Sequence, residues 1–293
     1  MIPPAVMREL RLIEIATARR MRTLRVGAYT SRQRGGGFDF DELQPYRPGD
    51  EVRRIDWNVT ARLDAPYIRH THAERELNML IAVDVSRSMD LGTSHLSKRE
   101  AMMYITASLV FSALAGQVNT GFVAFSDRAL FAAPPRRTRA AAWSLLEACW
   151  AAGDAAGRTA LLPALAQVSR RLRRMTMVFL VSDFLTSEDV FDSPELRLLS
   201  AAHDVIAVVP DDPGERALPA GAGYLAVRDL ESGRRATIAL SDRSRRGYAE
   251  QARRRRAALI DGFYRAAIDH VFVPTDGPAL EPLQTLFATR LRQ

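Results

Sequence analysis

A carboxylate and two hydroxyls alternate in the segment LIAVDVSRSM, residues 80–89. Four apolar residues lead into Asp84, and Ser86 and Ser88 follow it at every second position. Because alternate residues of a strand point to the same side, these three side chains are expected to emerge together where a buried strand ends. Oxygen ligands of this kind suit a hard cation such as Mg²⁺, Mn²⁺ or Ca²⁺, whereas zinc favours histidine and cysteine.

Two further oxygen-bearing side chains occur at comparable places later in the chain. Asp183 ends the apolar run MVFLVSD, and Thr159 lies in GRTALLPAL, just before an expected helix. In an open parallel sheet, ligands bind beyond the carboxyl ends of the strands. Two carboxylates and three hydroxyls are therefore expected to converge on one point. Such a set leaves an open position on the cation, which an acidic side chain of a partner could fill.

Helix capping is the alternative for the same residues. Serine, threonine and aspartate are favoured at helix amino termini, where their side-chain oxygens accept hydrogen bonds from free backbone N–H groups. Each residue taken singly suits a cap. Taken together, at one end of the expected sheet, they favour the metal site.

The elements that must position these residues follow an α/β pattern. Fully apolar runs that alternate with amphipathic stretches predict a mostly parallel sheet with helices on both faces. The expected strands cover residues 77–85, 120–126, 176–182, 204–210 and 271–275, and the expected helices cover about 97–116, 139–151, 160–173, 194–202 and 243–269. A hairpin near residues 223–240, with Ser232 and Gly233 at its turn, interrupts the alternation.

The amino-terminal quarter of the chain has a different character. An amphipathic helix over residues 6–25 precedes a glycine-rich loop and a segment rich in turns and short strands, with a tight turn at Pro48 and Gly49. We therefore expect a small amino-terminal module at residues 1–76 and an α/β domain at residues 77–293.

The motifs resemble those of a known family. DVSRS, then Thr159, then SDF with Asp183, looks like the metal-ion-dependent adhesion site of von Willebrand factor A domains. FDELQPYRPGDEVRRIDWNVTAR is similar to the hallmark of the bacterial family called domain of unknown function 58. The resemblance implies a von Willebrand factor A-like, Rossmann-like fold. It also implies that Ser86, Ser88 and Thr159 contact Mg²⁺ directly, while Asp84 and Asp183 act mostly through water.

The same resemblance implies a partner. Family members often accompany MoxR-type AAA+ ATPases in the maturation or remodelling of other protein complexes, which implies a chaperone-like adaptor whose metal site is completed by an acidic partner residue. Two departures stand out. Longer members carry amino-terminal membrane helices, and an acidic or amide residue often follows the threonine, where this chain has Ala160. Arg87 and Arg158 flank the expected ligands, and their charges favour an incoming acidic partner.

A second candidate surface lies in the segment PGDEVRRIDW, which holds Asp50, Arg54, Asp56 and Trp57. One interpretation is a docking surface with Trp57 as its aromatic anchor, since tryptophan and arginine dominate binding hot spots. The preferred interpretation is an internal lock, in which arginine pairs with aspartate and Trp57 is buried against the larger domain.

Two other patterns receive plainer interpretations. His70, His72 and Glu74 alternate along one expected strand and could hold a transition metal, but an exposed polar strand face is preferred. The arginine runs at 170–174 and 253–256 suggest nucleic acid, but successive helical residues lie about 100° apart, so such runs spread their charge around the helix. Solvated helix surface is preferred, and no specific nucleic-acid binding is expected.

Composition limits the remaining classes. The 293-residue chain has a net charge of +7, and Lys98 is its only lysine. Cys149, the single cysteine, lies in an apolar helical stretch and is expected to be buried. No stretch approaches the roughly 18 apolar residues of a membrane span, so we expect a cytoplasmic protein without membrane insertion. The rival function is a metal-dependent hydrolase, but a metal without a nearby candidate base suits binding better than catalysis, so no enzyme is expected.

Overall fold

The computed structural model describes residues 1–20, 39–47, 55, 57, 59–60, 65–72, 78–154, 157–172, 174–278 and 280–290. The chain forms two compact units, one of residues 1–27 with 77–293 and the other of residues 28–76. The boundary after residue 76 lies where expected, but residues 1–27 belong to the larger unit and not to the amino-terminal module. Helix α1 (Pro4–Arg20) packs against α3 (Lys98–Ala115) in the larger unit, because Val6, Leu10 and Ile13 bury their side chains in its core.

A six-stranded sheet with the order β10-β7-β6-β3-β4-β5 forms the centre of the larger unit. All neighbouring strands are parallel except β5, which pairs antiparallel with β4 at one edge. The strands are β3 (Asn78–Asp84), β4 (Asn119–Phe125), β5 (Ala129–Arg136), β6 (Met177–Val181), β7 (Asp204–Asp211) and β10 (Asp269–Pro274). The expected α/β fold with a mostly parallel sheet is confirmed, and its five parallel strands lie at the five predicted runs.

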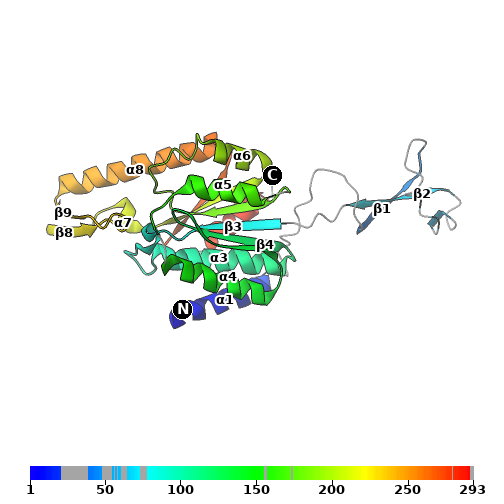
Figure 1. Ribbon diagram of the computed structural model, residues 1–293, viewed down its shortest axis with the longest axis horizontal. Coiled ribbons are helices and arrows are strands. Elements are labelled where there is room, and N and C mark those ends of the chain that lie inside the picture. Colours follow the sequence, from blue (N-terminus) through cyan, green and yellow to red (C-terminus); the bar gives the residue numbers. More distant parts are fainter. Residues whose placement is uncertain are drawn as a thin grey trace. The chain divides into compact units, whose positions relative to one another are not determined.

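Helices cover both faces of this sheet (Figure 1). They are α3, α4 (Arg139–Asp154), α5 (Leu161–Arg171), α6 (Pro194–Ala202), the short α7 (Pro213–Arg216), α8 (Asp242–Arg265) and α9 (Glu281–Arg290). Alternate residues of one strand enter different cores: Ile81 packs in the core with α1, α3 and α4, and Ala82 packs in the core with α5, α6 and α8. Two-sided burial explains why the central residues of β3, β4, β6 and β7 are apolar.

Local sequence signals set where several helices begin. Ser97 and Glu100 form a capping box at the start of α3, in which each side chain accepts a hydrogen bond from the other's backbone N–H. Ser193 caps α6, whose first residue is Pro194. The predicted and observed helices therefore share nearly the same starts.

The predicted hairpin is present. β8 (Gly223–Arg228) and β9 (Arg235–Leu240) pair only with each other, in an antiparallel two-stranded sheet. Gly233 has a φ of 72° in the turn, which is a conformation that glycine adopts without strain. Figure 1 shows the hairpin beyond α7, at the left of the view.

Besides the short η3 (Arg87–Asp90) and α7, two longer elements of the larger unit, β5 and α9, were not predicted. β5 contains Pro134 and Pro135 and is only partly buried, as is usual for an edge strand, where a missing N–H does not interrupt a ladder. α9 has weak amphipathic periodicity and buries only Leu283 fully. The amino-terminal helix also differs from its predicted range, beginning at Pro4, and the end expected at residue 25 lies outside the described residues.

The smaller unit contains an antiparallel pair, β1 (Asp39–Pro45) and β2 (Tyr67–His72), with an irregularity between Phe40 and Glu42. The Tyr67 backbone N–H donates a hydrogen bond to Thr60 Oγ1 over 3.1 Å. His70 and His72 belong to β2, as predicted, while Glu74 lies outside the described residues.

Surface chemistry agrees with several plain interpretations. Cys149 is fully buried, and burial raises the pKa of its thiol to about 12.

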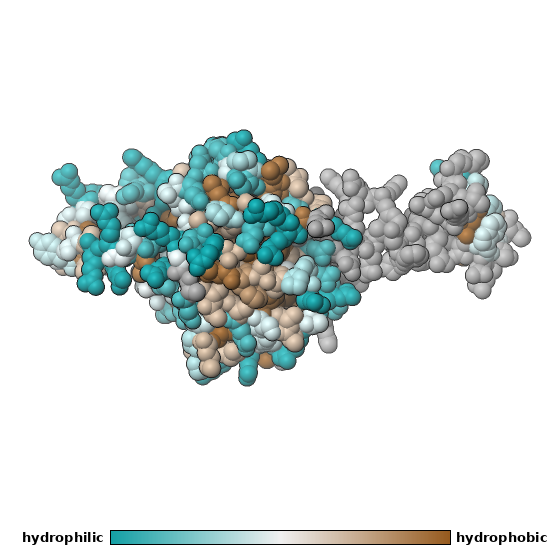
Figure 2. All heavy atoms as spheres, in the orientation of Figure 1, coloured by the Kyte–Doolittle hydropathy of each residue, from teal (hydrophilic) through white to brown (hydrophobic). Residues whose placement is uncertain are grey.

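Hydrophilic side chains cover much of the visible face (Figure 2). The arginines of α8 point to different partners: Arg253 and Arg254 pair with Glu250, while Arg256 pairs with Asp211. Of the helices that the structure describes, none has the length and apolar character to cross a membrane.

Candidate metal centre

Three hydroxyl groups gather beyond the carboxyl end of β3. Ser86 directly precedes the 3₁₀ turn that follows this strand, and Ser88 lies within that turn. Thr159 lies in the loop before α5. Thr159 Oγ1 is 2.8 Å from Ser86 Oγ and 3.5 Å from Ser88 Oγ, and the two serine oxygens are 3.1 Å apart. Ser86 and Thr159 are buried, and Ser88 is partly buried. The structure thus brings these three hydroxyls together, as expected.

Backbone hydrogen bonds hold the loops that carry the hydroxyls. The Arg87 N–H donates to the Gly157 carbonyl over 3.2 Å, and the Ala160 N–H donates to the Ser126 carbonyl over 3.0 Å. The Val85 N–H donates to the carbonyl of Phe125 at the end of β4 over 2.8 Å. Thr159 is therefore fixed between the ends of two neighbouring strands.

Asp84 lies beneath the hydroxyls and is fully buried. Its Oδ1 accepts a hydrogen bond from the Ser86 N–H over 2.9 Å, and its Oδ2 accepts one from the Ser182 hydroxyl over 2.7 Å. Burial, together with the negative charge of Asp183, raises the pKa of Asp84 to about 7. A bound cation would favour the ionised form and lower this pKa.

Asp183 is close to Asp84 but is engaged by a lysine. The fully buried Lys98 places its Nζ 2.5 Å from Asp183 Oδ2 and 2.5 Å from Glu215 Oε1. Burial alone would lower the pKa of Lys98, but the two carboxylates raise it above its ordinary value. For the Glu215 carboxyl, burial disfavours the charged form and raises the pKa. Asp183 and Glu215 thus share a single ammonium group, and a divalent cation near Asp84 would add positive charge beside these carboxylates.

Capping does not explain these residues. Ser86 precedes the 3₁₀ turn η3 (Arg87–Asp90), but its side chain makes no cap hydrogen bond. Helix α5 begins after Ala160 rather than Thr159, and its first N–H, that of Leu161, donates to Glu188 Oε2 over 2.5 Å. The capping alternative is therefore wrong for Ser86 and Thr159.

The oxygen spacing fits a small octahedral cation. With Mg–O distances of about 2.1 Å, neighbouring ligands of an octahedron lie about 3 Å apart, and the hydroxyl oxygens are 2.8, 3.1 and 3.5 Å apart. Three histidine, cysteine or acidic side chains arranged to hold a metal are not found together in the described part of the chain. A cation here would therefore rely on neutral hydroxyls and leave positions for further oxygen ligands.

Comparison with known families matches residues 42–258 to a family described as Protein of unknown function DUF58. The chain belongs to this DUF58 family. Uncharacterized proteins of Mycobacterium bovis and Mycobacterium tuberculosis are 29% identical to it over 291 residues, covering 99% of this chain and 91% of theirs.

Among solved structures, a conserved hypothetical protein BatB from Bacteroides thetaiotaomicron aligns at 15% identity and a TM-score of 0.49, over 74% of this DUF58 chain and 100% of its own. A von Willebrand factor type A protein from Catenulispora acidiphila aligns at 17% identity and a TM-score of 0.31, over 48% of this chain and 34% of its own.

A carboxylate that sequence reasoning missed touches the hydroxyl cluster of the DUF58 chain. Glu231, in the turn between β8 and β9, accepts hydrogen bonds at Oε1 from the Thr159 hydroxyl over 2.7 Å and from the Thr159 N–H over 2.9 Å. Nothing in the local sequence of the turn indicates this contact, because it depends on where the hairpin docks.

Lys98 was also missed as a site residue, although the sequence carried a signal. It is the only lysine among 41 basic residues. The single lysine of this arginine-rich chain is buried, and its compact ammonium contacts two carboxylates.

The remaining predicted residues lie in different surroundings. Arg87 and Arg158 are exposed beside the cluster, as expected. Trp57 is 66% exposed on the smaller unit. Asp50, Arg54 and Asp56 lie outside the described residues, so both the docking surface and the internal lock stay predictions.

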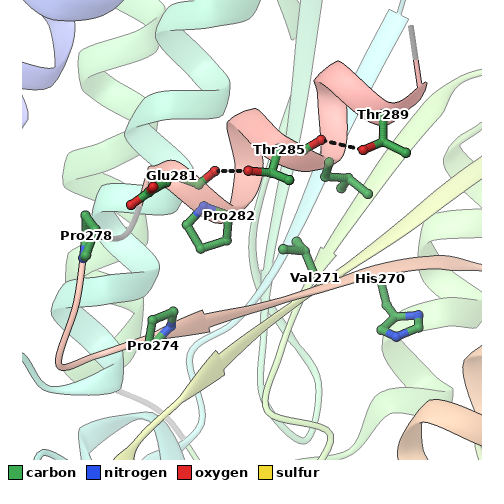
Figure 3. A pocket seen from close by; sticks show the side chains of 9 residues that line it. His270, Val271, Pro274, Pro278, Glu281, Pro282, Thr285 and Thr289 are labelled. Atoms are coloured by element: carbon green, nitrogen blue, oxygen red, sulfur yellow. Dashed lines mark hydrogen bonds between the residues drawn. The ribbon is translucent and has the colours of Figure 1, made fainter. Parts of the chain in front are cut away.

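A cavity of about 490 Å³ lies elsewhere, between β10 and α9. Figure 3 shows side chains from both elements facing it, among them Val271 of β10 and Pro282 of α9. None of the predicted site residues lines this cavity.

Proposed function

We propose that this DUF58 protein is a non-enzymatic adaptor that binds a protein partner through a divalent cation. The observation that supports the proposal is the cluster of Ser86, Ser88 and Thr159 hydroxyls over the buried Asp84, with spacings suited to one face of a Mg²⁺ octahedron. In this proposal the larger unit is von Willebrand factor A-like, and the cluster is its metal-ion-dependent adhesion site.

Each residue has a role in the proposed site. The three hydroxyls bind the cation directly. Asp84 supplies negative charge and holds the Ser86 backbone, and Asp183 acts mostly through water while its other oxygen is bound to Lys98. Mg²⁺ is the proposed cation, and Mn²⁺ and Ca²⁺ accept the same ligand types.

The proposed partner offers an acidic side chain. A carboxylate is the natural ligand for an open position on a hard cation, and the exposed guanidinium groups of Arg87 and Arg158 would attract it. By the family resemblance, the partner is a MoxR-type AAA+ ATPase or a member of the same complex, and the adaptor serves the maturation or remodelling of that complex.

Calorimetric titration of Mg²⁺ into the wild-type protein and Asp84→Ala tests the proposal. We expect the wild type to bind and the variant, still folded by circular dichroism, to lose binding. Asp189→Ala, at an exposed aspartate in the segment that follows β6, is the matched control and should bind like the wild type. Retained Mg²⁺ binding by folded Asp84→Ala, or none by the wild type, would contradict the site.

A further inference from the structure

The carboxylate of Glu231 reaches the hydroxyl cluster from within the chain. Glu231 and Thr159 are 72 positions apart and belong to different loops, yet one carboxylate oxygen accepts both the hydroxyl and the backbone N–H of Thr159. Its distance of 2.7 Å from the Thr159 oxygen is close to the spacing of adjacent ligands around Mg²⁺, about 3 Å. Glu231 thus lies where an acidic residue completing the proposed site would lie.

The turn of the hairpin is built to present this carboxylate. Asp229 Oδ1 accepts hydrogen bonds from the backbone N–H groups of Glu231 and Ser232 over 2.8 and 2.9 Å. These bonds to Ser232 and, to a lesser degree, the nearby charge of Arg158 lower the pKa of Asp229. Arg158, which was expected to attract a partner's acid, therefore faces the acidic turn of its own chain.

The hairpin is anchored at its base and lightly packed elsewhere. Near the base, Arg245 of α8 donates to the Gly221 carbonyl over 2.6 Å, and Ser244 donates to the Ala239 carbonyl over 2.6 Å. None of the residues of β8 and β9 is buried, and Tyr224 is 80% exposed. A two-stranded hairpin without a buried face is marginally stable by itself, and segments with few buried apolar contacts open most readily. The turn can therefore leave the cluster without disturbing the core.

We propose that Glu231 is an internal ligand that completes the cation site until a partner replaces it. Its carboxylate takes the position that the hydroxyls leave open, and an acidic side chain of the partner binds only when the hairpin turn withdraws. Both groups are carboxylates and need the same position, so they exclude each other. This inference rests on the proposed function, because it assumes that the hydroxyl cluster binds a cation.

Two measurements on the full chain test this role. Calorimetric titration compares Mg²⁺ binding by wild type, Glu231→Gln and Asp84→Ala. We expect Glu231→Gln, which keeps the side-chain shape and removes the charge, to weaken binding about ten- to hundredfold. Hydrogen–deuterium exchange of peptides covering 223–240, in Mg²⁺ and in EDTA, should show protection by Mg²⁺ in the wild type and none in Glu231→Gln.

A matched control tests whether the loss of any surface carboxylate has the same effect as the loss of the Glu231 carboxylate. Glu147→Gln removes an exposed carboxylate from α4 and should behave like the wild type in both measurements. If Asp84→Ala loses Mg²⁺ binding while Glu231→Gln binds as tightly as the wild type and Mg²⁺ leaves hairpin exchange unchanged, the internal ligand is refuted and the adhesion site stands. If the wild type does not bind Mg²⁺, both proposals are refuted.

Discussion

Replacing Asp84 by asparagine removes a charge that the fold buries without a full counter-charge. Asparagine keeps the shape of the side chain, and its carbonyl oxygen can accept the hydrogen bond that the Ser86 N–H donates to Asp84. Its amide can donate to Ser182 Oγ, which now donates to Asp84 Oδ2. We therefore expect Asp84→Asn to make the cation-free protein more stable at neutral and alkaline pH.

The magnitude follows from the pKa of Asp84, which is raised from 3.8 to about 7 by burial and by Asp183. A raised carboxyl pKa means that the folded state binds the proton more tightly, so the wild type loses stability as pH rises between these two values. A difference of about 3 between the two pKa values corresponds to about 4 kcal/mol. The advantage of Asp84→Asn should thus be small at about pH 4 and grow to at most about 4 kcal/mol at about pH 8.

Urea unfolding in EDTA, followed by circular dichroism across this pH range, measures the difference. Asp189→Asn, at an exposed position, is the control and should not change the pH dependence. Mg²⁺ should stabilise the wild type but not Asp84→Asn, because only the ionised carboxylate favours the cation. This reasoning would be refuted if Asp84→Asn were less stable than the wild type at about pH 8 in EDTA. It would also be refuted if the difference in the free energy of unfolding between the two proteins were the same at every pH.

Three further substitutions probe the surroundings of the site and the core. Lys98→Met leaves Asp183 and Glu215 without the ammonium group that pairs with them, so the free energy of unfolding at neutral pH should fall by about 3–5 kcal/mol. An unchanged urea midpoint would show that the ammonium does not stabilise the fold. Gly262→Ala places a Cβ closer to the ring of Phe191 than van der Waals contact allows, and thermal unfolding should reveal a loss of about 1–3 kcal/mol, whereas wild-type stability would mean that the ring moves freely. Ser97→Ala removes the capping box of α3 and should cost about 1 kcal/mol, with urea unfolding as the measure; no loss would mean that Glu100 caps the helix alone.

The central sheet was predictable because its strands are buried on both sides. A run such as residues 79–83 has to be apolar throughout when helices cover both faces of the sheet, and this pattern is visible without any knowledge of neighbours. β5 lacked that signal because an edge strand is half exposed and tolerates Pro134 and Pro135. α9 was missed because a helix that buries little carries a weak periodic pattern.

The candidate site was predictable where spacing along the chain decides geometry. Asp84, Ser86 and Ser88 follow one strand, so their positions depend on a few bonds. The contacts of Lys98 with Asp183 and of Glu231 with Thr159 join residues 85 and 72 positions apart. Such contacts depend on how helices and the hairpin pack, and no local pattern encodes them.

The contact between Glu231 and Thr159 has a consequence for how strongly a partner must bind. A carboxylate tethered to its own site acts at an effective concentration of about millimolar or more, and the hairpin base fastened to α8 keeps it near. If the proposed site binds a cation, a partner present at micromolar concentration would not outcompete Glu231 with a single acidic side chain of equal affinity. It would have to add contacts outside the cation, and its affinity would then depend on a second surface as much as on the metal.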